Sequence, residues 1–301
     1  MSAGLHGLSI GHATDGAART GCTVLLGPFR AGCHICGHAT GTRELDALSP
    51  LHLVPRIDAL LLTGGSAFGL GAADGVMTWL ENRGRGFDTG IARVPIVPAA
   101  VIFDLAIATR RPDAAMGMAA CEAARATPPA MGRVGAGTGA TVGKWLGPTH
   151  ASPGGFGWHT GTHEAWTLVG VAVVNALGDV FGPAGDVVAG ARNADGTFAG
   201  GRGRTGRVNA GDGSAGATNT TLAAIITDAP LSRSTLEILA RMASAALARR
   251  ISPVYTPFDG DIVFALSTAD GAPEIDARTL VGLGAAAAVV LEDAILAAVQ
   301  P

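Results

Sequence analysis

The junction between Asn219 and Thr220 carries the sharpest chemical signal in this 301-residue sequence. A tract over 189–218, rich in Gly, Ala, Asn and Arg, is typical of a loop, and an apolar strand over 219–227 follows it directly. If the bond before Thr220 breaks, this residue gains an α-amine, whose ordinary pKa is about 7.7–8.0, within reach of its own hydroxyl. One residue would then supply both nucleophile and base. The simpler alternative is a β-branched threonine pair that only starts a strand.

Two carboxylates, Asp259 and Asp261, stand directly before an apolar segment over 262–267. Side chains at this spacing can orient an amine or a hydroxyl, or bind a cation. An acidic turn before a strand explains the same residues, because Asp and Gly are common in turns.

Asn175 and Lys144 are two further candidates. Asn175 ends a buried apolar run over 167–175, where its amide must find a partner or serve a ligand, and it could donate to an oxyanion. Lys144 is the one lysine among 21 basic residues and follows a glycine-rich loop over 133–143. A lysine kept in such an arginine-rich chain points to a role for a compact charge whose pKa shifts readily.

Two glycine motifs fail as phosphate-binding loops. In the P-loop comparison, Trp145 follows Gly143-Lys144 where Ser or Thr is required. The loose dinucleotide fingerprint over 135–140 has no clear strand before it, and 45 glycines make chance matches common. We therefore expect no cofactor.

The remaining motifs have structural explanations. Ser66 is near a nucleophile elbow but lacks the final glycine, and we interpret it as a helix N-cap. The segment over 33–38 (CHICGH) has metal-like spacing, but a structural zinc site needs four converging ligands and no second pair follows. We expect no metal.

Apolar runs and helical patterns place these residues on elements. Strands are expected over 21–26, 57–63, 167–175, 219–227 and 262–267. Helices are expected over 67–82, 114–125 and 281–299, together with one opened by a capping box from Ser234 to Glu237. The strands are continuous apolar runs, so both faces of their sheets are covered. A layered α/β sandwich follows.

Composition limits the partners. Only 15% of residues are charged and the net charge is -3, so we expect no nucleic-acid partner. The apolar run over 280–291 stops at Glu292, short of the roughly 18 residues that span a bilayer, and the first residues do not resemble a secretory signal. Four cysteines are too few for a disulfide scaffold. These features predict a soluble cytoplasmic protein with no membrane partner.

Together the motifs resemble the L-aminopeptidase/D-esterase (DmpA-like) family, which includes β-aminopeptidases and nylon-oligomer hydrolases. The resemblance runs in order along nearly the whole chain. The segments that carry it are LTGGSAFGL (62–70), VPIVPAAVIFDL (94–105), RPDAAM (111–116), GAGTGATVGK (135–144), VVNALGD (173–179), NTTL (219–222) and TPFDGD (256–261).

The resemblance implies a four-layer αββα sandwich of the N-terminal-nucleophile type. It also implies one domain over 1–301 that cleaves itself into chains 1–219 and 220–301. The family tends to form tetramers, so the resemblance implies a homotetramer of processed heterodimers.

Catalytic roles follow from the same resemblance. Thr220 matches the nucleophile, and Lys144, Asn175, Asp259 and Asp261 match the groups around it in nylon-oligomer hydrolases. Aminopeptidase relatives usually have a Ser nucleophile and a Ser/Glu pair in place of the two aspartates. The chain therefore leans toward the nylon-oligomer branch.

Phe103 departs from part of the family. Some relatives place a tyrosine hydroxyl in the oxyanion hole at the matching position, whereas phenylalanine has no donor. Phe103 is thus a candidate for the substrate pocket, and Asn175 or a backbone amide would stabilise the oxyanion. Tyr255 is the only tyrosine in the sequence.

Three functions remain open. The first is hydrolysis of small amides, peptides or ω-amino acid oligomers such as those of 6-aminohexanoate, with aminopeptidase, D-esterase and β-aminopeptidase activity as alternatives. The second is acyl transfer of the ornithine acetyltransferase type, which shares a self-cleaving threonine but whose junction lacks the Asn-Thr-Thr run. The third is a non-enzymatic binding protein that keeps the fold.

Overall fold

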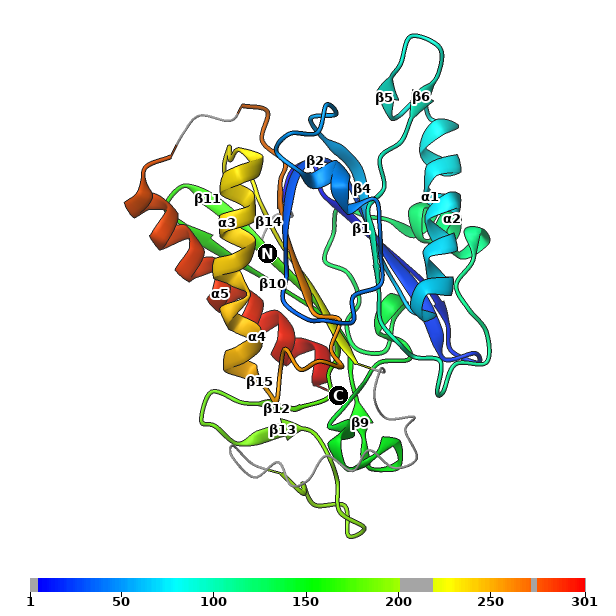
Figure 1. Cartoon of the computed structure of the whole chain (residues 1–301), viewed down its shortest axis with the longest axis vertical. Coiled ribbons are helices and arrows are strands. Elements are labelled where there is room, and N and C mark those ends of the chain that lie inside the picture. Colours follow the sequence, from blue (N-terminus) through cyan, green and yellow to red (C-terminus); the bar gives the residue numbers. More distant parts are fainter. Residues whose placement is uncertain (1–4, 201–218, 272–274, 301) are drawn as a thin grey trace.

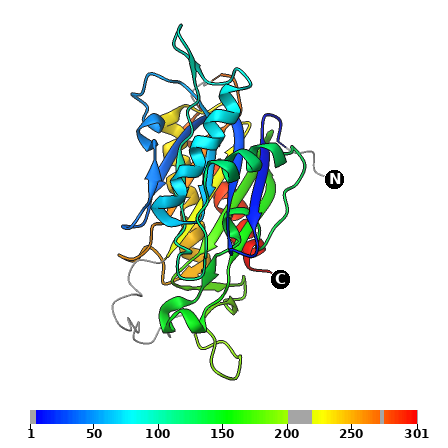
Figure 2. The ribbon, with the colours of Figure 1, turned by 90° about the vertical axis from the view of Figure 1, so that its right-hand side faces the viewer.

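A nine-stranded sheet folded into two layers organises the chain (Figures 1 and 2). The computed structural model describes residues 5–200, 219–271 and 275–300. The strand order is β10 (Gly155–His163), β11 (Trp166–Asn175), β14 (Thr220–Thr227), β16 (Ile262–Ser267), β2 (Thr20–Ile35), β4 (Ile57–Thr63), β7 (Ala99–Val101) and β3 (Thr42–Arg43), and β1 (Ser9–Asp15) also pairs with β2.

Strand β2 joins the two layers. Its first half pairs with β1 and β4, and its second half, from Arg30 to Ile35, pairs with β16. The register with β4 shifts between Leu26 and Phe29, which permits the long strand to change layers.

Three apolar clusters separate four layers. One lies between the two sheet layers and includes Leu60, Leu222 and Phe264. A second packs α3 (Arg233–Ala243), α4 (Ala245–Arg250) and α5 (Ala277–Val299) onto the layer that contains β10, β11, β14 and β16. A third packs α1 (Ala72–Glu81) and α2 (Ala114–Ala123) onto the layer of β1, β2 and β4. The predicted αββα sandwich is confirmed.

Two predicted helix caps are wrong. Helix α3 begins at Arg233, and the Ser232 hydroxyl accepts from the Thr235 N–H at 3.2 Å, so Ser232 and not Ser234 is the N-cap. Ser66 caps no helix, because it lies inside the 3₁₀ segment η2 (Ser66–Gly71) with a φ of 53°. Its own N–H donates to the Ile102 carbonyl, which ties the turn after β4 to the chain beyond β7.

The long predicted elements appear near their expected positions. Strands β4 and β11 match 57–63 and 167–175 closely, and α5 begins four residues before the predicted 281. Of the loop tract over 189–218, residues 201–218 lie outside the described residues. The short elements are β5 (Phe87–Asp88), β6 (Arg93–Val94), β8 (Thr141–Val142), β9 (Ser152–Pro153), β12 (Asp179–Phe181), β13 (Val187–Ala189), β15 (Ile251–Ser252), η1 (Leu45–Leu48), η3 (Gly135–Gly137), η4 (Lys144–Leu146) and η5 (Pro148–His150).

Helix α5 corrects the expectation that no segment is long and apolar enough to cross a membrane. Its 23 residues meet that test by length and composition. Half of its most apolar window is buried inside the fold, where the helix packs against β10, β11 and α3. A core helix that covers a sheet has this same composition, so the finding is weak evidence for a membrane span.

Candidate active site

Sheet register gathers most of the predicted site residues at one end of the sandwich. Strand β11 runs antiparallel to β14, with Asn175 opposite Thr220. Strand β16 runs parallel to β14. Directly before these two strands, Asn219 and Asp259 form a β-bridge. The end of β11 and the starts of β14 and β16 therefore coincide, which brings together the amide, the threonine and the two carboxylates.

Lys144 reaches this end from η4. Its backbone N–H donates to the Leu177 carbonyl at 2.9 Å, and its Nζ donates to the backbone oxygen and to Oδ1 of Asn175 at 2.9 and 3.0 Å. The preceding Gly143 has a φ of 73°, and a Cβ there would lie 2.0 Å from the Ala191 nitrogen, so only glycine fits.

Burial controls the charge of Lys144. The residue is 8% exposed, and desolvation lowers the pKa of its ammonium from 10.5 to about 7. Asp259, Asp261 and Asp104 oppose this by attracting the positive charge. A lysine in this setting exchanges its proton near neutral pH.

Hydrogen bonds fix the orientation of the Asn175 amide. Its Oδ1 accepts from the Thr141 N–H at 3.0 Å and from Lys144 Nζ, so its Nδ2 faces the opposite way. Nδ2 donates to the Phe103 carbonyl at 3.2 Å. The fully buried amide thus presents its nitrogen in one direction only.

Thr220 lies against the peptide bond that precedes it. The residue is 4% exposed, and its hydroxyl donates to the Asn219 carbonyl oxygen. The same oxygen accepts from the Gly260 N–H at 3.0 Å. A backbone donor therefore already polarises the carbonyl that the hydroxyl touches.

The two aspartates are 1% exposed and bond mainly to nearby backbone. Asp259 Oδ2 accepts from the N–H and the hydroxyl of Thr256 at 2.8 and 2.6 Å. Asp261 accepts from the N–H groups of Thr221, at 2.6 Å, and Tyr255, at 3.3 Å. Burial, with the neighbouring Asp259 second, raises the pKa of Asp261 to about 7, and burial also raises the pKa of Asp259.

Phe103 meets the site through its backbone. Its side chain is half-buried, and its carbonyl holds the Asn175 amide, a contact that the sequence did not reveal. The Tyr255 hydroxyl donates to the Ser244 carbonyl, away from this amide. The backbone donor that the structure places on the Asn219 carbonyl is the Gly260 N–H, and Asn175 lies opposite Thr220 in the sheet.

Sequence reasoning missed two residues that the structure places at the site. Gly260 supplies the donor to Asn219, and a Cβ on it would lie 2.8 Å from Thr220 Oγ1. Asp104 is 2% exposed and attracts the Lys144 charge. The available signal was an acid directly after the apolar run over 99–103.

The metal-like segment over 33–38 forms no metal site among the described residues. Cys33 and Cys36 are free thiols. Burial raises the pKa of each thiol to about 11, so both are protonated at neutral pH.

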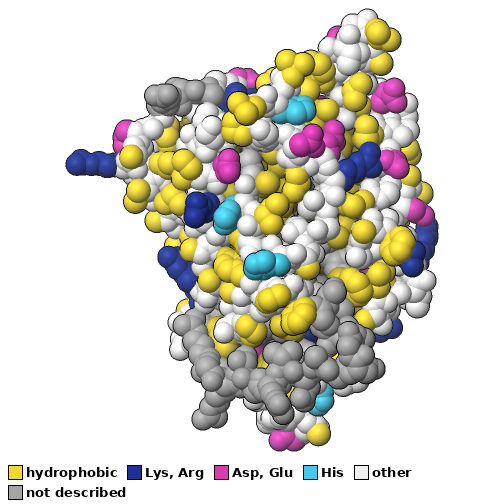
Figure 3. Space-filling model, in the orientation of Figure 1, with side chains coloured by type: hydrophobic (Ala, Val, Ile, Leu, Met, Phe, Trp, Pro, Cys, Tyr) yellow, Lys and Arg dark blue, Asp and Glu magenta, His cyan; other side chains and the backbone are white. Residues whose placement is uncertain are grey.

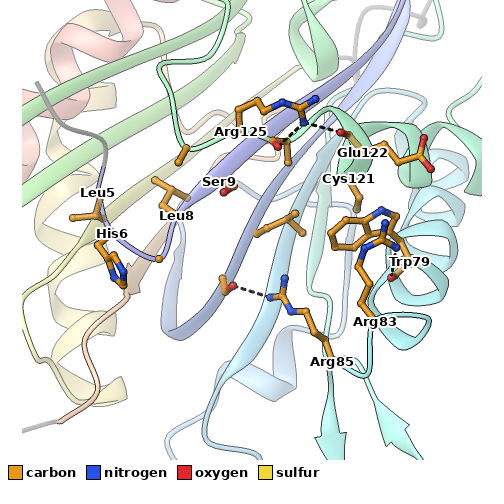
Figure 4. A pocket seen from close by; sticks show the side chains of 15 residues that line it. Leu5, His6, Leu8, Ser9, Trp79, Arg83, Arg85, Cys121, Glu122 and Arg125 are labelled. Atoms are coloured by element: carbon orange, nitrogen blue, oxygen red, sulfur yellow. Dashed lines mark hydrogen bonds between the residues drawn. The ribbon is translucent and has the colours of Figure 1, made fainter. Parts of the chain in front are cut away.

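A separate cavity of about 690 Å³ lies beside α1, α2 and β1 and includes none of the predicted site residues (Figure 4). Its arginines serve the fold: Arg85 donates to the carbonyls of Gly27 and Asp58, and Arg125 donates to the carbonyls of Glu122 and Ala124. On the face in Figure 3, acidic and basic side chains are interspersed.

The chain is similar to known proteins along nearly its whole length. Residues 4–300 match the model of peptidase family S58. An uncharacterised aminopeptidase of Mycobacterium tuberculosis is 41% identical over 307 residues, covering 93% of this chain and 85% of the relative. A 6-aminohexanoate-oligomer endohydrolase of Kocuria sp. is 31% identical over 320 residues, covering 98% and 84%.

Solved structures share the fold. A β-aminopeptidase of Burkholderia sp. superimposes with a TM-score of 0.70 at 23% identity, covering 98% of this chain and 84% of the other. The L-aminopeptidase D-Ala-esterase/amidase of Ochrobactrum anthropi, described as a variant of the Ntn hydrolase fold, gives 0.71 at 20% identity with the same coverage. The chain therefore belongs to peptidase family S58, and its class of activity is the hydrolysis of amide bonds.

Proposed function

We propose that this protein is an amide hydrolase that uses Thr220 as its nucleophile and matures by cleaving the bond between Asn219 and Thr220. The observation that carries the proposal is the contact between the Thr220 hydroxyl and the Asn219 carbonyl oxygen, which also accepts from the Gly260 N–H. Lys144, Asn175 and the two aspartates surround this junction.

Maturation begins when Thr220 Oγ1 attacks the Asn219 carbonyl carbon. The Gly260 N–H stabilises the oxyanion, the C–N bond breaks, and the nitrogen takes the proton that the hydroxyl loses and becomes the α-amine of Thr220. Water then hydrolyses the resulting ester, which leaves a carboxylate on Asn219 and restores the hydroxyl. The products are chains 1–219 and 220–301 of one domain.

Substrate hydrolysis uses the same groups. The new α-amine takes the proton of the Thr220 hydroxyl, whose oxygen attacks the substrate carbonyl. The amine then passes this proton to the substrate nitrogen, the C–N bond breaks and the product amine leaves, and water hydrolyses the remaining acyl-enzyme to a carboxylate. The amide of Asn175 steadies the oxyanion, because its orientation is fixed by Thr141 and Lys144. The charge of Lys144 favours the alkoxide, and Asp259 and Asp261 hold the amine.

Two substrate classes fit the relatives. The aspartate pair and the threonine nucleophile favour oligomers of ω-amino acids such as 6-aminohexanoate. The higher identity to proteins named aminopeptidases, 41% against 31%, favours release of N-terminal residues from peptides as the second candidate. Acyl transfer to an amine acceptor ranks below both.

We further propose that the processed heterodimers form a homotetramer and that the protein is cytoplasmic. The family resemblance supports the tetramer. The four cysteines, too few for a disulfide scaffold, support the location.

Intact-mass spectrometry of the purified wild-type chain tests the proposal. We expect two masses that sum to that of the whole chain plus one water, the smaller one starting at Thr220. Thr220→Ala should give one uncut mass and no hydrolysis, whereas Thr221→Val should be cut normally. Within the described part of the chain the Thr221 hydroxyl has no hydrogen-bond partner, which makes it a matched control. A Thr220→Ala protein with full hydrolase activity would refute the proposal.

Product analysis separates the substrate classes. A linear 6-aminohexanoate oligomer and a peptide of similar length are supplied with a free or an acetylated N-terminus. An endohydrolase cuts both forms of the oligomer, whereas an aminopeptidase needs the free amine. Added amine acceptors reveal acyl transfer as a new amide product.

A further inference from the structure

Asp104 is a third buried carboxylate near the site, and the mechanism above gives it no role. It follows β7, and its side chain is held at both oxygens. Oδ2 accepts from the Thr20 hydroxyl at 2.6 Å, and Oδ1 accepts from the Gly65 N–H at 2.7 Å. The residue is 2% exposed, so this charge is buried away from solvent and arranged by specific donors.

Two glycine motifs make room for this carboxylate. A Cβ on Gly64 would lie 2.3 Å from Asp104 Oδ2, and one on Gly139 would lie 2.8 Å from the same oxygen. Neither position accepts a side chain while Asp104 keeps its place. Gly64, beside the near-elbow serine, and Gly139, in the glycine-rich loop, are therefore both required by the position of Asp104.

The backbone beside Asp104 reaches the site. The carbonyl of the preceding Phe103 accepts from Asn175 Nδ2 at 3.2 Å. Ile102 is fixed on both sides, because its N–H donates to the Thr63 carbonyl and its own carbonyl accepts from the Ser66 N–H. The Asp104 carboxylate bonds to the same turn through the Gly65 N–H. Hydrogen bonds therefore connect residues 102–104 to the end of β4 on one side and to Asn175 on the other.

Asp104 also affects the protonation of Lys144. Asp259, Asp261 and Asp104 attract the positive charge of Lys144, which raises its pKa against the effect of burial. The first two residues precede β16, whereas Asp104 comes from the layer of β4 and β7. Its negative charge favours the protonated form of Lys144 from the other sheet layer.

We propose that Asp104 is a positioning residue of the active site. It braces the Phe103 carbonyl that orients the Asn175 amide, and it serves as a counter-charge to Lys144. The proposal rests on the function assigned above, because it acts through Asn175 and Lys144 and not on the substrate.

Asp104→Asn tests the charge with little change of shape, and Thr20→Val tests the hydrogen bond alone. The value of kcat is divided by the fraction of chains that are cut before Thr220, which mass spectrometry measures. For Asp104→Asn we expect this kcat to fall at least about tenfold, while KM changes less than about threefold. The alkaline limb of its kcat profile should move to lower pH, because Lys144 loses an attracting charge. Thr20→Val should lower kcat by about threefold or more.

Asp58→Asn is the matched control. Its partly buried carboxylate accepts from the Ile96 N–H at 2.9 Å, and among the described residues no hydrogen bond joins it to the site. We expect kcat to be unchanged in this variant, even where its unfolding midpoint falls as far as that of Asp104→Asn.

The outcomes separate the inference from the proposed function. An uncut, inactive wild-type chain refutes the function itself. A cut, active wild type with an unchanged kcat in Asp104→Asn overturns the positioning role alone. If Asp104→Asn does not fold, Thr20→Val decides, and an unchanged kcat there overturns the inference.

Discussion

Lys144 illustrates how one buried group links stability to pH. In the folded chain its pKa is about 7, whereas in the unfolded chain it returns to 10.5. Between these values the unfolded chain binds more protons, so the free energy of unfolding rises with pH, by at most about 1.4 kcal/mol per pH unit. We compare the unfolding midpoint of uncut Thr220→Ala with that of the double variant Thr220→Ala/Lys144→Met. The difference between the two midpoints should increase in favour of Thr220→Ala as the pH is raised from 7 to 10.

Thermal unfolding across this range, followed by circular dichroism, provides the measurement. The double variant lacks the titrating ammonium and keeps all other groups. Parallel curves for the two proteins would show that the pKa of Lys144 is not lowered in the folded chain.

Gly260 gives a second prediction at the residue scale. A Cβ there would lie 2.8 Å from Thr220 Oγ1 and 2.7 Å from the Ala39 backbone oxygen, which cannot easily move. We expect Gly260→Ala to slow cleavage at Asn219 at least about tenfold, because the hydroxyl is displaced from the carbonyl. Time-resolved mass spectrometry after purification measures the cut fraction.

Gly71→Ala is the control for this substitution. Its φ is -60° and a Cβ there meets nothing within 4 Å, so cleavage should proceed at the wild-type rate. If Gly260→Ala is cut as fast as Gly71→Ala, the close packing around Thr220 does not control maturation.

At the scale of elements, helix α5 depends on one charged residue within an apolar sequence. Glu292 is 8% exposed and pairs with Arg249 at 2.9 Å and Arg250 at 2.7 Å, which join α5 to the end of α4. Removing the carboxylate charge leaves the Arg250 side chain, 14% exposed, without that counter-charge. We expect Glu292→Gln to lower the free energy of unfolding by about 1–3 kcal/mol.

Urea denaturation measures this loss. Asp293→Asn is a suitable comparison, because its side chain is 42% exposed and faces His159 at 3.6 Å, so it should cost less than about 0.5 kcal/mol. Equal losses in the two variants would contradict a special role for Glu292.

The elements that the sequence predicts well are the continuous apolar ones. Strands β4 and β11 stand out because both faces are buried, and Asn175 ends β11 as the apolar run predicts. Its position opposite Thr220 comes from the sheet register, which the strand pattern alone does not give. The extension of β2 beyond residue 26 was not predicted, because Gly27 and Pro28 interrupt the apolar run and the irregular pairing there is a tertiary feature.

Contacts distant in sequence set the limit of prediction. Asp104 bonds to groups 84 and 39 residues away, at Thr20 and Gly65, so its place after the apolar run over 99–103 does not reveal these partners. The N-cap of α3 was misplaced because Ser232 and Ser234 both satisfy the local preference, and the path of the preceding chain chooses between them.

At the scale of the whole molecule, cleavage at Thr220 would divide a structure whose two parts are interleaved. Strand β14 begins the second chain and lies between β11, from the first chain, and β16, from the second. Strand β16 pairs in turn with β2 of the first chain, and α5 packs on β10 and β11. Each chain thus completes a sheet and an apolar core that the other cannot complete alone.

We therefore expect chains 1–219 and 220–301 to stay together after cleavage. Size-exclusion chromatography with light scattering should give one species that contains both chains in equal amounts, with the mass of four 29.9-kDa units, and denaturant should separate them. The uncut Thr220→Ala protein should elute at the same position, because cleavage removes no strand from the sheet. Separating the two chains requires breaking the strand pairs β11–β14 and β16–β2. Release of free chain 1–219 without denaturant would therefore show that the shared sheet does not hold the two chains together.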